Sequence, residues 1–288
     1  MDILKKELIL GTANFNRSYR LSQKTNFEAT KLLIKAYENG INTLDISNSY
    51  NGAYGFVADT GLDWKLNAKI VLPEQKKSLE YEIRLKVLEI FELMPKVEIS
   101  NLMIHNISDV SSFGINAVSI ALRKIAKEFE IKKLGISLYP EQILNISSEN
   151  FDLIQIPINV VDQRVLTRNI LENFLQPYNQ VQARSIYLRG LLASSSEIFE
   201  QKDQLNLNTI TLFKDWCRGK VLNTSFVCMN FVYHLNFITQ IIFGANDINE
   251  LNENIDYFNK SKFTKINIPY KDFESNNLKL IDPRYWNS

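Results

Sequence analysis

The sequence predicts a single (β/α)8 TIM barrel, in which eight parallel strands close into a cylinder with helices on the outside. Strand-like and helix-like patterns alternate at a mean spacing of about 36 residues over the 288-residue chain, which is typical of repeated βα units. No Gly-x-Gly-x-x-Gly follows the first strand, which argues against the main rival, a doubly wound open sheet. We interpret residues 1–288 as one domain, in which 260–288 form a tail that packs over one end of the barrel.

The first half of the chain carries four predicted strands, which are short apolar runs at 8–13, 41–46, 66–72 and 97–104. Two helices with apolar residues at helical spacing are predicted at 27–39 and 79–94. The first helix stops at Gly40, because glycine tolerates the left-handed turn that follows many helices. The second stops before Pro95, which cannot continue a helix. One charge, Lys69, interrupts the third strand.

The second half repeats this alternation, with predicted strands at 133–137, 151–157, 181–186 and 237–243. The helices expected around these strands are 115–129, a short one from Pro140, 164–175 and two within 194–236. The last of these is apolar almost all round, which indicates burial against the barrel. Asp247 and Glu250 form a capping-box pattern that opens the final helix.

Composition and charge exclude several classes of function. The chain is 45% hydrophobic and 23% charged, as globular domains are, and its formal net charge of +1 offers no electrostatic footprint for nucleic acid or an anionic membrane. The longest apolar stretch, 226–243, contains Asn230, His234 and Gln240, so we expect a buried helix and strand there and no membrane span. The first residues carry charges and lack the apolar core of a signal peptide, which predicts a cytoplasmic protein.

Cysteine and histidine are scarce in this chain. Cys217 and Cys228 form no Cys-x-x-Cys pair, so we interpret them as core thiols in a reducing cytoplasm. With two histidines in all, a histidine-based metal site is not expected. His234 lies in the apolar helix, where we assign it a structural role.

Four reactive side chains converge if the barrel prediction is right. Asp45, Lys69 and His105 lie at the ends of the second, third and fourth strands, and these strands are neighbours. Tyr50 follows in the loop after the second strand. The set offers a phenol to give a proton, an ammonium to stabilise phenolate, a carboxylate to keep that ammonium charged and an imidazole to orient a carbonyl. This equipment suits the reduction of a C=O group.

In this order and context the four residues resemble the catalytic tetrad of the aldo-keto reductases. The contexts are Leu44-Asp45-Ile-Ser-Asn-Ser-Tyr50, Asn67-Ala-Lys69 and Leu102-Met-Ile-His105. Further segments that resemble the family, in the same order along the chain, are Leu10-Gly11-Thr12, Leu134-Gly-Ile-Ser137, Ile154-Gln155-Ile-Pro-Ile-Asn159, Ser185 with Gly190-Leu-Leu192, Phe243-Gly-Ala-Asn246 and Leu251-Asn-Glu-Asn254. Asp162-Gln-Arg164 and Ala183-Arg184-Ser185 are similar to a bacterial branch often encoded among surface-polysaccharide genes.

The resemblance implies an NAD(P)H-dependent oxidoreductase that reduces the carbonyl group of a small aldehyde or ketone, with a sugar-derived substrate as the finer expectation. Tyr50 is then the proton donor, and Lys69 and Asp45 tune it. His105 polarises the carbonyl. By the same resemblance, the residues expected to bind NADH or NADPH are Gly11, Thr12, Ser137, Gln155, Arg184, Ser185, Leu188, Gly190, Gly244, Ala245, Asn246, Glu250 and Asn254. Ser137 and Gln155 among them are assigned to the nicotinamide carboxamide.

Several positions depart from the family pattern. Asn51 and Tyr54 stand where relatives have a glycine and a glutamate. Tyr54 is followed by glycine and is a rival for the catalytic phenol, although spacing along the chain favours Tyr50. Leu138 replaces an asparagine, so one carboxamide contact is missing. Arg184 replaces a tyrosine that stacks on the nicotinamide in many relatives, and its guanidinium can stack, reach an anionic substrate or form a structural salt bridge.

The cofactor segment favours NADH over NADPH. Relatives that prefer the phosphorylated cofactor place Arg or Lys where this chain has Asn246 and Glu250. A carboxylate repels a 2′-phosphate but accepts a hydrogen bond from a free ribose hydroxyl. Glu250 also has a structural interpretation, as the third residue of the capping box.

Two other functions stay open at this point. The departures at Asn51 and Tyr54 fit a barrel that keeps the cofactor pocket but has lost turnover and acts as a regulatory binding module. Lys69, in an apolar strand, also fits the Schiff-base nucleophile of a barrel lyase or isomerase. No oligomeric state is predicted.

Overall fold

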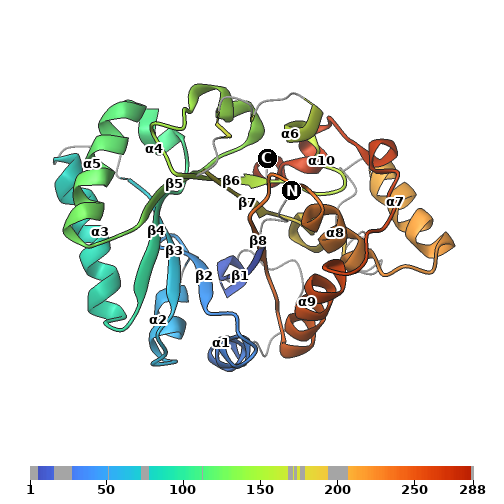
Figure 1. Ribbon diagram of the computed structural model, residues 1–288, viewed down its shortest axis with the longest axis horizontal. Coiled ribbons are helices and arrows are strands. Elements are labelled where there is room, and N and C mark those ends of the chain that lie inside the picture. The colour runs from blue at the N-terminus through green and yellow to red at the C-terminus, as the bar shows by residue number, and fades with distance from the viewer. Residues whose placement is uncertain are drawn as a thin grey trace.

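Eight parallel strands close into a barrel in sequence order, which confirms the predicted fold class (Figure 1). The computed structural model describes residues 6–15, 28–50, 52–72, 78–111, 113–167, 171, 174–175, 179–193 and 207–286. The strands are β1 Glu7–Gly11, β2 Thr43–Ser47, β3 Lys65–Ile70, β4 Glu98–Ile104, β5 Lys133–Ser137, β6 Leu153–Pro157, β7 Gln180–Arg184 and β8 Gln240–Phe243. All eight strand predictions are thus confirmed, with ends that shift by up to three residues.

Helices surround this barrel, and most of them lie where the apolar spacing predicts. They are α1 Ala29–Glu38, α2 Ala53–Ala58, α3 Leu79–Leu93, α4 Ser108–Ser111, α5 Ile115–Glu128, α6 Arg164–Thr167, α7 Asn208–Gly219, α8 Thr224–Tyr233 and α9 Ile248–Ser261. Gly40 follows α1 with φ +83°, the left-handed conformation expected of it. The short segment from Pro140 is a 3-10 helix, η3 Pro140–Asn145.

Three of these helices differ from the sequence prediction. The apolar pattern does not predict α2 or α4, because six and four residues are too few to display a helical period. The helix predicted at 164–175 has one described turn, α6, and Leu171 and Phe174 are buried in turns beyond it. An apolar pair this close in sequence is buried equally well by a turn. Parts of the predicted segments 27–39, 164–175 and 194–236 lie outside the described residues.

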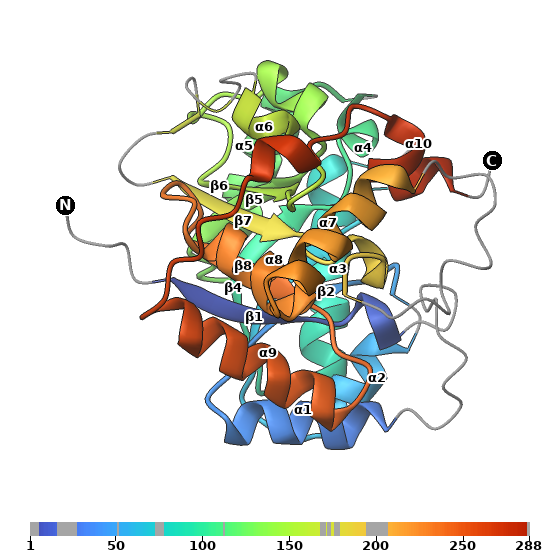
Figure 2. The ribbon, with the colours of Figure 1, turned by 90° about the vertical axis from the view of Figure 1, so that its right-hand side faces the viewer.

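The strands all point toward one end of the barrel, and the short C-terminal elements lie at that end (Figure 2). These elements are η6 Tyr270–Phe273, α10 Leu278–Ile281 and η7 Pro283–Tyr285. The Ser275 backbone donates to Val161 O at 2.9 Å, and Gln163 Nε2 donates to Tyr270 O at 2.5 Å, so this tail contacts the loop after β6.

Apolar side chains fill the layer between strands and helices, whereas the strands also bury polar side chains such as Asp45, Lys69 and Gln155. Trp64, Phe151, Phe174 and Phe213 are among the largest fully buried side chains. Cys217 and Cys228 are buried free thiols. Among the described residues, no helix combines the length and the apolar character needed to cross a membrane.

Candidate active site

Asp45, Lys69 and Tyr50 form one hydrogen-bonded unit at the carboxyl ends of β2 and β3. Lys69 Nζ lies 2.6 Å from Asp45 Oδ2 and donates to Tyr50 Oη at 2.9 Å. Ser47 pairs in register with Lys69, and Asp45, two residues earlier in β2, points to the same side of the sheet. Lys69 is 2% exposed and Tyr50 7% exposed, so the pair is nearly shielded from water.

The charges of this unit follow from its burial. Burial lowers the pKa of Lys69, but the carboxylate of Asp45 and the hydroxyl of Tyr50 more than offset it, and the net effect raises that pKa above its ordinary value. Lys69 is therefore an ammonium at neutral pH, hydrogen-bonded to a phenol. A cation in this position stabilises phenolate and so makes the phenol a better proton donor.

His105 stands beside the phenol, one residue after β4. Its ring meets the Tyr50 ring edge-to-face, with 5.6 Å between centroids. Burial, with the charges of Lys69 and Arg184, lowers the pKa of His105 to about 3, so the imidazole is neutral. The Ser47 and Ser49 hydroxyls each lie 3.1 Å from Nδ1, and donation from either favours the tautomer with its proton on Nε2. A neutral imidazole of this form can donate a hydrogen bond to a carbonyl oxygen.

Tyr54, the rival phenol, does not join the group. It lies on α2, and its hydroxyl is buried with no hydrogen-bond partner among the residues that the structure describes. Burial raises the pKa of Tyr54 far above its ordinary value, and the charge of Glu89 adds to this effect. Such a phenol is a poor acid. Asn51, the other departure in this loop, lies outside the described residues.

Gln155 and Ser137 extend the unit to β5 and β6. Gln155 Nε2 donates to Asp45 Oδ1 at 2.7 Å, and Gln155 Oε1 accepts from Lys69 at 3.2 Å and from Ser137 at 3.3 Å. The amide predicted to hold the nicotinamide carboxamide thus supports the Asp45–Lys69 pair. Thr12 is fully buried, and its hydroxyl donates to the Asp45 carbonyl, so it holds β2 in place.

The loop after β7 is the most strained backbone near the site. Ser185, Leu188 and Arg189 have φ of +58°, +47° and +52°, and Gly190 follows at +92°. Non-glycine residues in this region cost free energy, and such residues cluster at ligand sites. Asn159 Nδ2 donates to Ser185 O at 3.1 Å and so anchors the start of the loop.

The segment after β8 meets this loop from the other side. The Tyr187 hydroxyl donates to Asn254 Oδ1, which joins the loop to α9. The side chain of Asp247 caps α9, and the Glu250 carboxylate accepts from both nitrogens of Asn246, at 2.8 and 2.9 Å. Asp247 thus caps α9 as predicted, whereas the Glu250 carboxylate binds Asn246, the residue before the N-cap, in place of the Asp247 backbone N–H of a capping box.

Three of the predicted cofactor residues are small residues at the carboxyl ends of β1 and β8. A Cβ on Gly11 would lie 3.1 Å from Ile242 Cγ2, and a Cβ on Gly244 would lie 2.5 Å from Asn14 Nδ2. Ala245 is fully buried. Protein groups thus approach Gly11 and Gly244 closely, and a side chain at Gly244 would require Asn14 to move.

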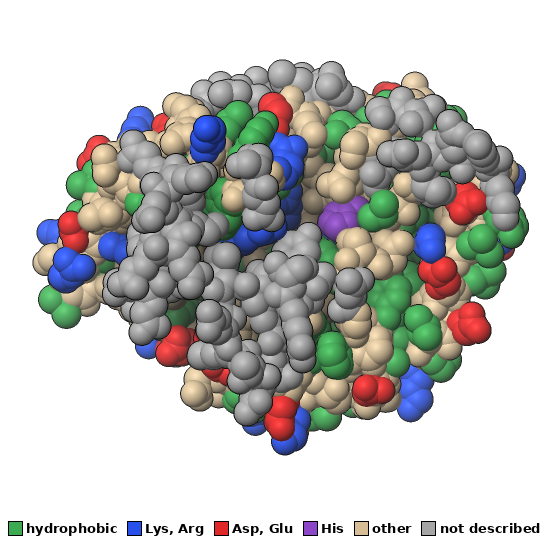
Figure 3. Space-filling model, turned by 180° about the vertical axis from the view of Figure 1, so that it is seen from behind, with side chains coloured by type: hydrophobic (Ala, Val, Ile, Leu, Met, Phe, Trp, Pro, Cys, Tyr) green, Lys and Arg blue, Asp and Glu red, His purple; other side chains and the backbone are tan. Residues whose placement is uncertain are grey.

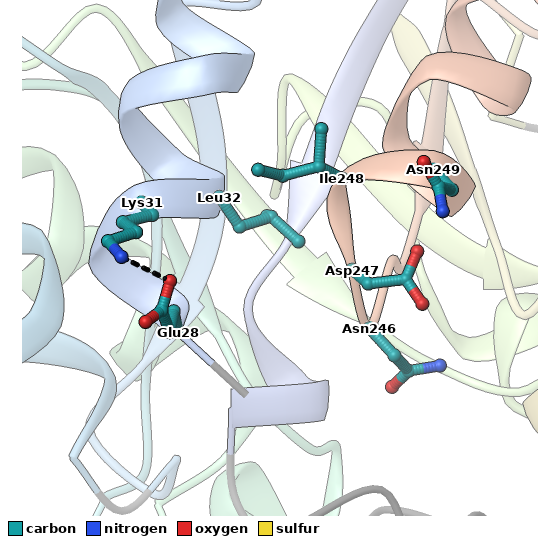
Figure 4. A pocket seen from close by; sticks show the side chains of 7 residues that line it. All are labelled: Glu28, Lys31, Leu32, Asn246, Asp247, Ile248 and Asn249. Carbon is teal, nitrogen blue, oxygen red and sulfur yellow. Dashed lines mark ion pairs between the residues drawn. The ribbon is translucent and has the colours of Figure 1, made fainter. Parts of the chain in front are cut away.

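A pocket of about 230 Å³ opens between the first turns of α1 and α9. Figure 4 shows Glu28, Lys31 and Leu32 facing the segment 246–249 across it. Lys31 is paired with Glu28 at 2.7 Å, and Asp247 adds a second carboxylate. The charged residues of the lining thus sum to one negative charge.

The comparisons with known proteins agree with this geometry. The model of the aldo/keto reductase family matches residues 7–272. The chain belongs to the aldo/keto reductase family. No curated protein matches the chain by sequence.

Solved aldo-keto reductases share the fold at low sequence identity. One from Bacillus halodurans, in a holo form, superimposes with a TM-score of 0.68 at 17% identity, covering 93% of this chain and 90% of that one. A protein from Pseudomonas aeruginosa titled as an aldo-keto reductase gives a TM-score of 0.61 at 17% identity, over 88% and 90% of the two chains. The chain is thus an NAD(P)H-dependent oxidoreductase by family.

The residues of this aldo/keto reductase fit a nicotinamide dinucleotide. Arg184 Nε is a buried donor for which the described residues supply no partner, which leaves it for a bound cofactor or substrate. The strained loop 185–190 contacts the second turn of α9 through Tyr187 and Asn254, and the amino end of such a helix favours anionic groups. Figure 3 views the molecule from behind Figure 1, the side to which the strands point, and shows basic side chains and a histidine around a hollow.

Sequence reasoning missed several members of the site. Ser47 and Ser49 lie between Asp45 and Tyr50 in the sequence and orient the His105 ring, but the sequence pattern does not predict this role. Gln182 and Gln240, which continue the hydrogen bonds of Gln155, are amides in otherwise apolar strands, and that is the signal that could have identified them.

Proposed function

We propose that this aldo/keto reductase reduces its carbonyl substrate by proton transfer from Tyr50. The observation that carries the proposal is the contact between the phenol and a buried ammonium, Lys69 Nζ to Tyr50 Oη at 2.9 Å, with Asp45 behind the ammonium. A reduced nicotinamide, when bound, supplies the hydride.

The protein residues act on the carbonyl oxygen. His105, neutral and held at Nδ1 by two serine hydroxyls, donates from Nε2 and polarises the C=O bond. Tyr50 gives its proton as negative charge grows on that oxygen, and Lys69 stabilises the phenolate left behind. Ser185, Leu188 and Gly190, in the strained loop, would hold the pyrophosphate of a bound dinucleotide.

NADH is proposed as the preferred cofactor. The pocket between α1 and α9 has a net negative lining, its lysine is already paired, and Glu250 adds a carboxylate nearby. A 2′-phosphate in this region meets repulsion that a free ribose hydroxyl does not. Dissociation constants for NADH and NADPH, measured by fluorescence titration, decide the point, and tighter binding of NADPH would contradict it.

The chemistry of Lys69 argues against a Schiff-base lyase. A Schiff base needs a neutral amine, whereas Asp45 and Tyr50 raise the pKa of this ammonium.

We further propose a sugar-derived substrate and a cytoplasmic role in surface-polysaccharide synthesis, supported by the Asp162-Gln-Arg164 and Ala183-Arg184-Ser185 segments.

One pair of variants tests the catalytic proposal. Tyr50→Phe should lower kcat/KM for aldehyde reduction about 1,000-fold, within the range of general acid catalysis, and leave the cofactor dissociation constant unchanged. Tyr54→Phe is the matched control and should keep its activity, because the Tyr54 hydroxyl has no partner. Full activity in Tyr50→Phe with loss in Tyr54→Phe would reverse the assignment. Cofactor binding without oxidation by any aldehyde or keto-sugar would instead indicate the regulatory module.

A further inference from the structure

Arg184 carries a charge that the described part of the chain leaves without an ion pair. Among the residues that the structure describes, none places a carboxylate within ion-pair distance of it, and its hydrogen bonds to Ser185 Oγ and Leu138 O are both long, at 3.4 Å. Its Nε is buried and has no hydrogen-bond partner. A buried donor without a partner destabilises the protein. A ligand that accepts a hydrogen bond from it therefore binds more favourably.

A neighbouring arginine shows what a structural role looks like here. Arg284 lies over the same Tyr139 ring, 3.4 Å from its centroid, while Arg184 lies 4.7 Å from it. Arg284 also binds Asp282 at 2.5 Å and Glu141 at 2.8 Å. Both arginines stack on one aromatic ring, but only Arg284 is neutralised. The structural salt bridge that was one interpretation of Arg184 is therefore absent from the described residues.

Arg184 also stands in the right place to meet a substrate. It ends β7 at the carboxyl end of the barrel, and its charge, with that of Lys69, acts on the His105 ring. The guanidinium thus shares one site with the imidazole that polarises the carbonyl. A planar fork of N–H donors, oriented by an aromatic ring, matches the two oxygens of a carboxylate.

We propose that Arg184 binds a carboxylate on the carbonyl substrate, so that the enzyme acts on oxo acids or aldehyde acids such as uronic acids. The inference rests on the proposed carbonyl reduction and narrows its substrate class. The pyrophosphate of the dinucleotide offers the same kind of oxygens to Arg184. Arg184 lies near His105, beside the position of the reacting carbonyl. We therefore favour the substrate carboxylate over the pyrophosphate as the group that supplies these oxygens.

The test compares matched substrates that differ in one anionic group: glyoxylate with methyl glyoxylate, and glucuronate with glucose. The wild type should prefer the acid of at least one pair in kcat/KM by about tenfold or more. Arg184→Gln should lose roughly 10- to 100-fold on that acid and far less on its neutral partner, so that the preference disappears. Arg284→Gln, which alters the stack on Tyr139 but not this charge, should keep the preference. Equal rates on acid and neutral partners in the wild type, or an unchanged preference in Arg184→Gln, would overturn the proposal.

Two binding measurements separate the remaining outcomes. ADP-ribose carries the pyrophosphate without the nicotinamide, and if Arg184→Gln weakens its binding while substrate preference is unchanged, the guanidinium serves the cofactor and the proposal is wrong. Oxamate is a carboxylate that is not reduced, and calorimetry should show it binding to the wild type at least tenfold more tightly than to Arg184→Gln. If no carbonyl is reduced at all, the proposed function fails, and the oxamate result still decides the role of Arg184: equal binding, or none, refutes it.

Discussion

Lys69 and Asp45 depend on each other because both are buried. Their side chains are 2% and 5% exposed, and each supplies the charge that makes the other tolerable. Lys69→Met should therefore leave Asp45 as an uncompensated buried carboxylate and lower the free energy of unfolding by about 3–5 kcal/mol. Urea unfolding at pH 7 measures this. The double variant Lys69→Met with Asp45→Asn should recover a large part of the loss, and no recovery would mean that the pair is not the cause.

His105 makes stability depend on pH in a predictable direction. Its pKa is about 3 in the folded chain, lowered first by burial, against 6.5 in the unfolded chain. Below pH 6.5 the unfolded state therefore binds a proton that the folded state does not, and stability falls as the pH falls toward 3. Between pH 7.5 and 5.0, His105 lowers the free energy of unfolding by about 2 kcal/mol. We expect the free energy of unfolding of His105→Gln, measured with urea, to fall over this pH range by about 2 kcal/mol less than that of the wild type. Equal decreases in the variant and the wild type would show that the folded protein protonates the His105 ring as readily as the unfolded chain does.

At the residue scale, the sequence predicted the reactive set better than its supports. Asp45, Lys69 and His105 could be chosen because a reactive side chain at the end of an apolar strand is conspicuous. Spacing along the chain favours Tyr50 over Tyr54, and the structure adds that the Tyr50 hydroxyl accepts a hydrogen bond from Lys69. Gln155 illustrates the limit of motif reasoning, because the resemblance predicts only a cofactor contact for its amide and gives no sign that the amide also bonds Asp45 and Lys69.

At the element scale, a row of amides crosses four strands of the barrel. Gln155 donates to Gln182 at 3.1 Å, Gln182 to Gln240 at 2.7 Å and Gln240 to the Glu7 carboxylate at 2.6 Å. The strand register pairs each member with the next, so the row follows the hydrogen-bonding direction of the sheet from β6 to β1. Glu7 can only accept and Lys69 can only donate, so the two ends fix the orientation of every amide between them.

This row predicts a coupled effect on stability. Gln182→Leu should leave one N–H of Gln155, whose Nε2 keeps its bond to Asp45, and the Oε1 of Gln240 without the partners they have in this row, and cost about 1–3 kcal/mol. Gln240→Leu should lower the free energy of unfolding less in the Gln182→Leu variant than in the wild type, because the two side chains share one hydrogen bond. A double-mutant cycle by urea unfolding tests this, and strictly additive losses would show that the row does not act as a unit.

Elements were predictable where they are long or continuously apolar. The strands were found because a parallel barrel buries both faces of each strand, which leaves apolar runs that few other structures need. The segment 53–58 and the segment after Arg164 were not, because a helix of one or two turns leaves no period in the sequence.

At the scale of the whole molecule, a network of ion pairs between side chains holds the C-terminal elements. Glu141, in η3, binds both Arg164 at 3.0 Å and Arg284 at 2.8 Å, and the fully buried Asp282 also binds Arg284. Contacts of this kind join the tail to the loops after β5 and β6. Because residues so far apart in sequence meet, no local pattern could have predicted the network.

The network predicts how the tail opens. Glu141→Gln removes one carboxylate from both arginines but leaves the Asp162–Arg164 and Asp282–Arg284 pairs in place. Hydrogen exchange should therefore quicken about tenfold within residues 277–286, while the exchange of β1 to β8 stays unchanged, because local opening takes less free energy than global unfolding. Lys132, which is paired with Glu98 on the surface, gives a matched control: Glu98→Gln removes an exposed pair and should leave the tail's exchange unaltered. Uniform acceleration across the barrel in Glu141→Gln would show that the tail is an integral part of the core and not a separately held segment.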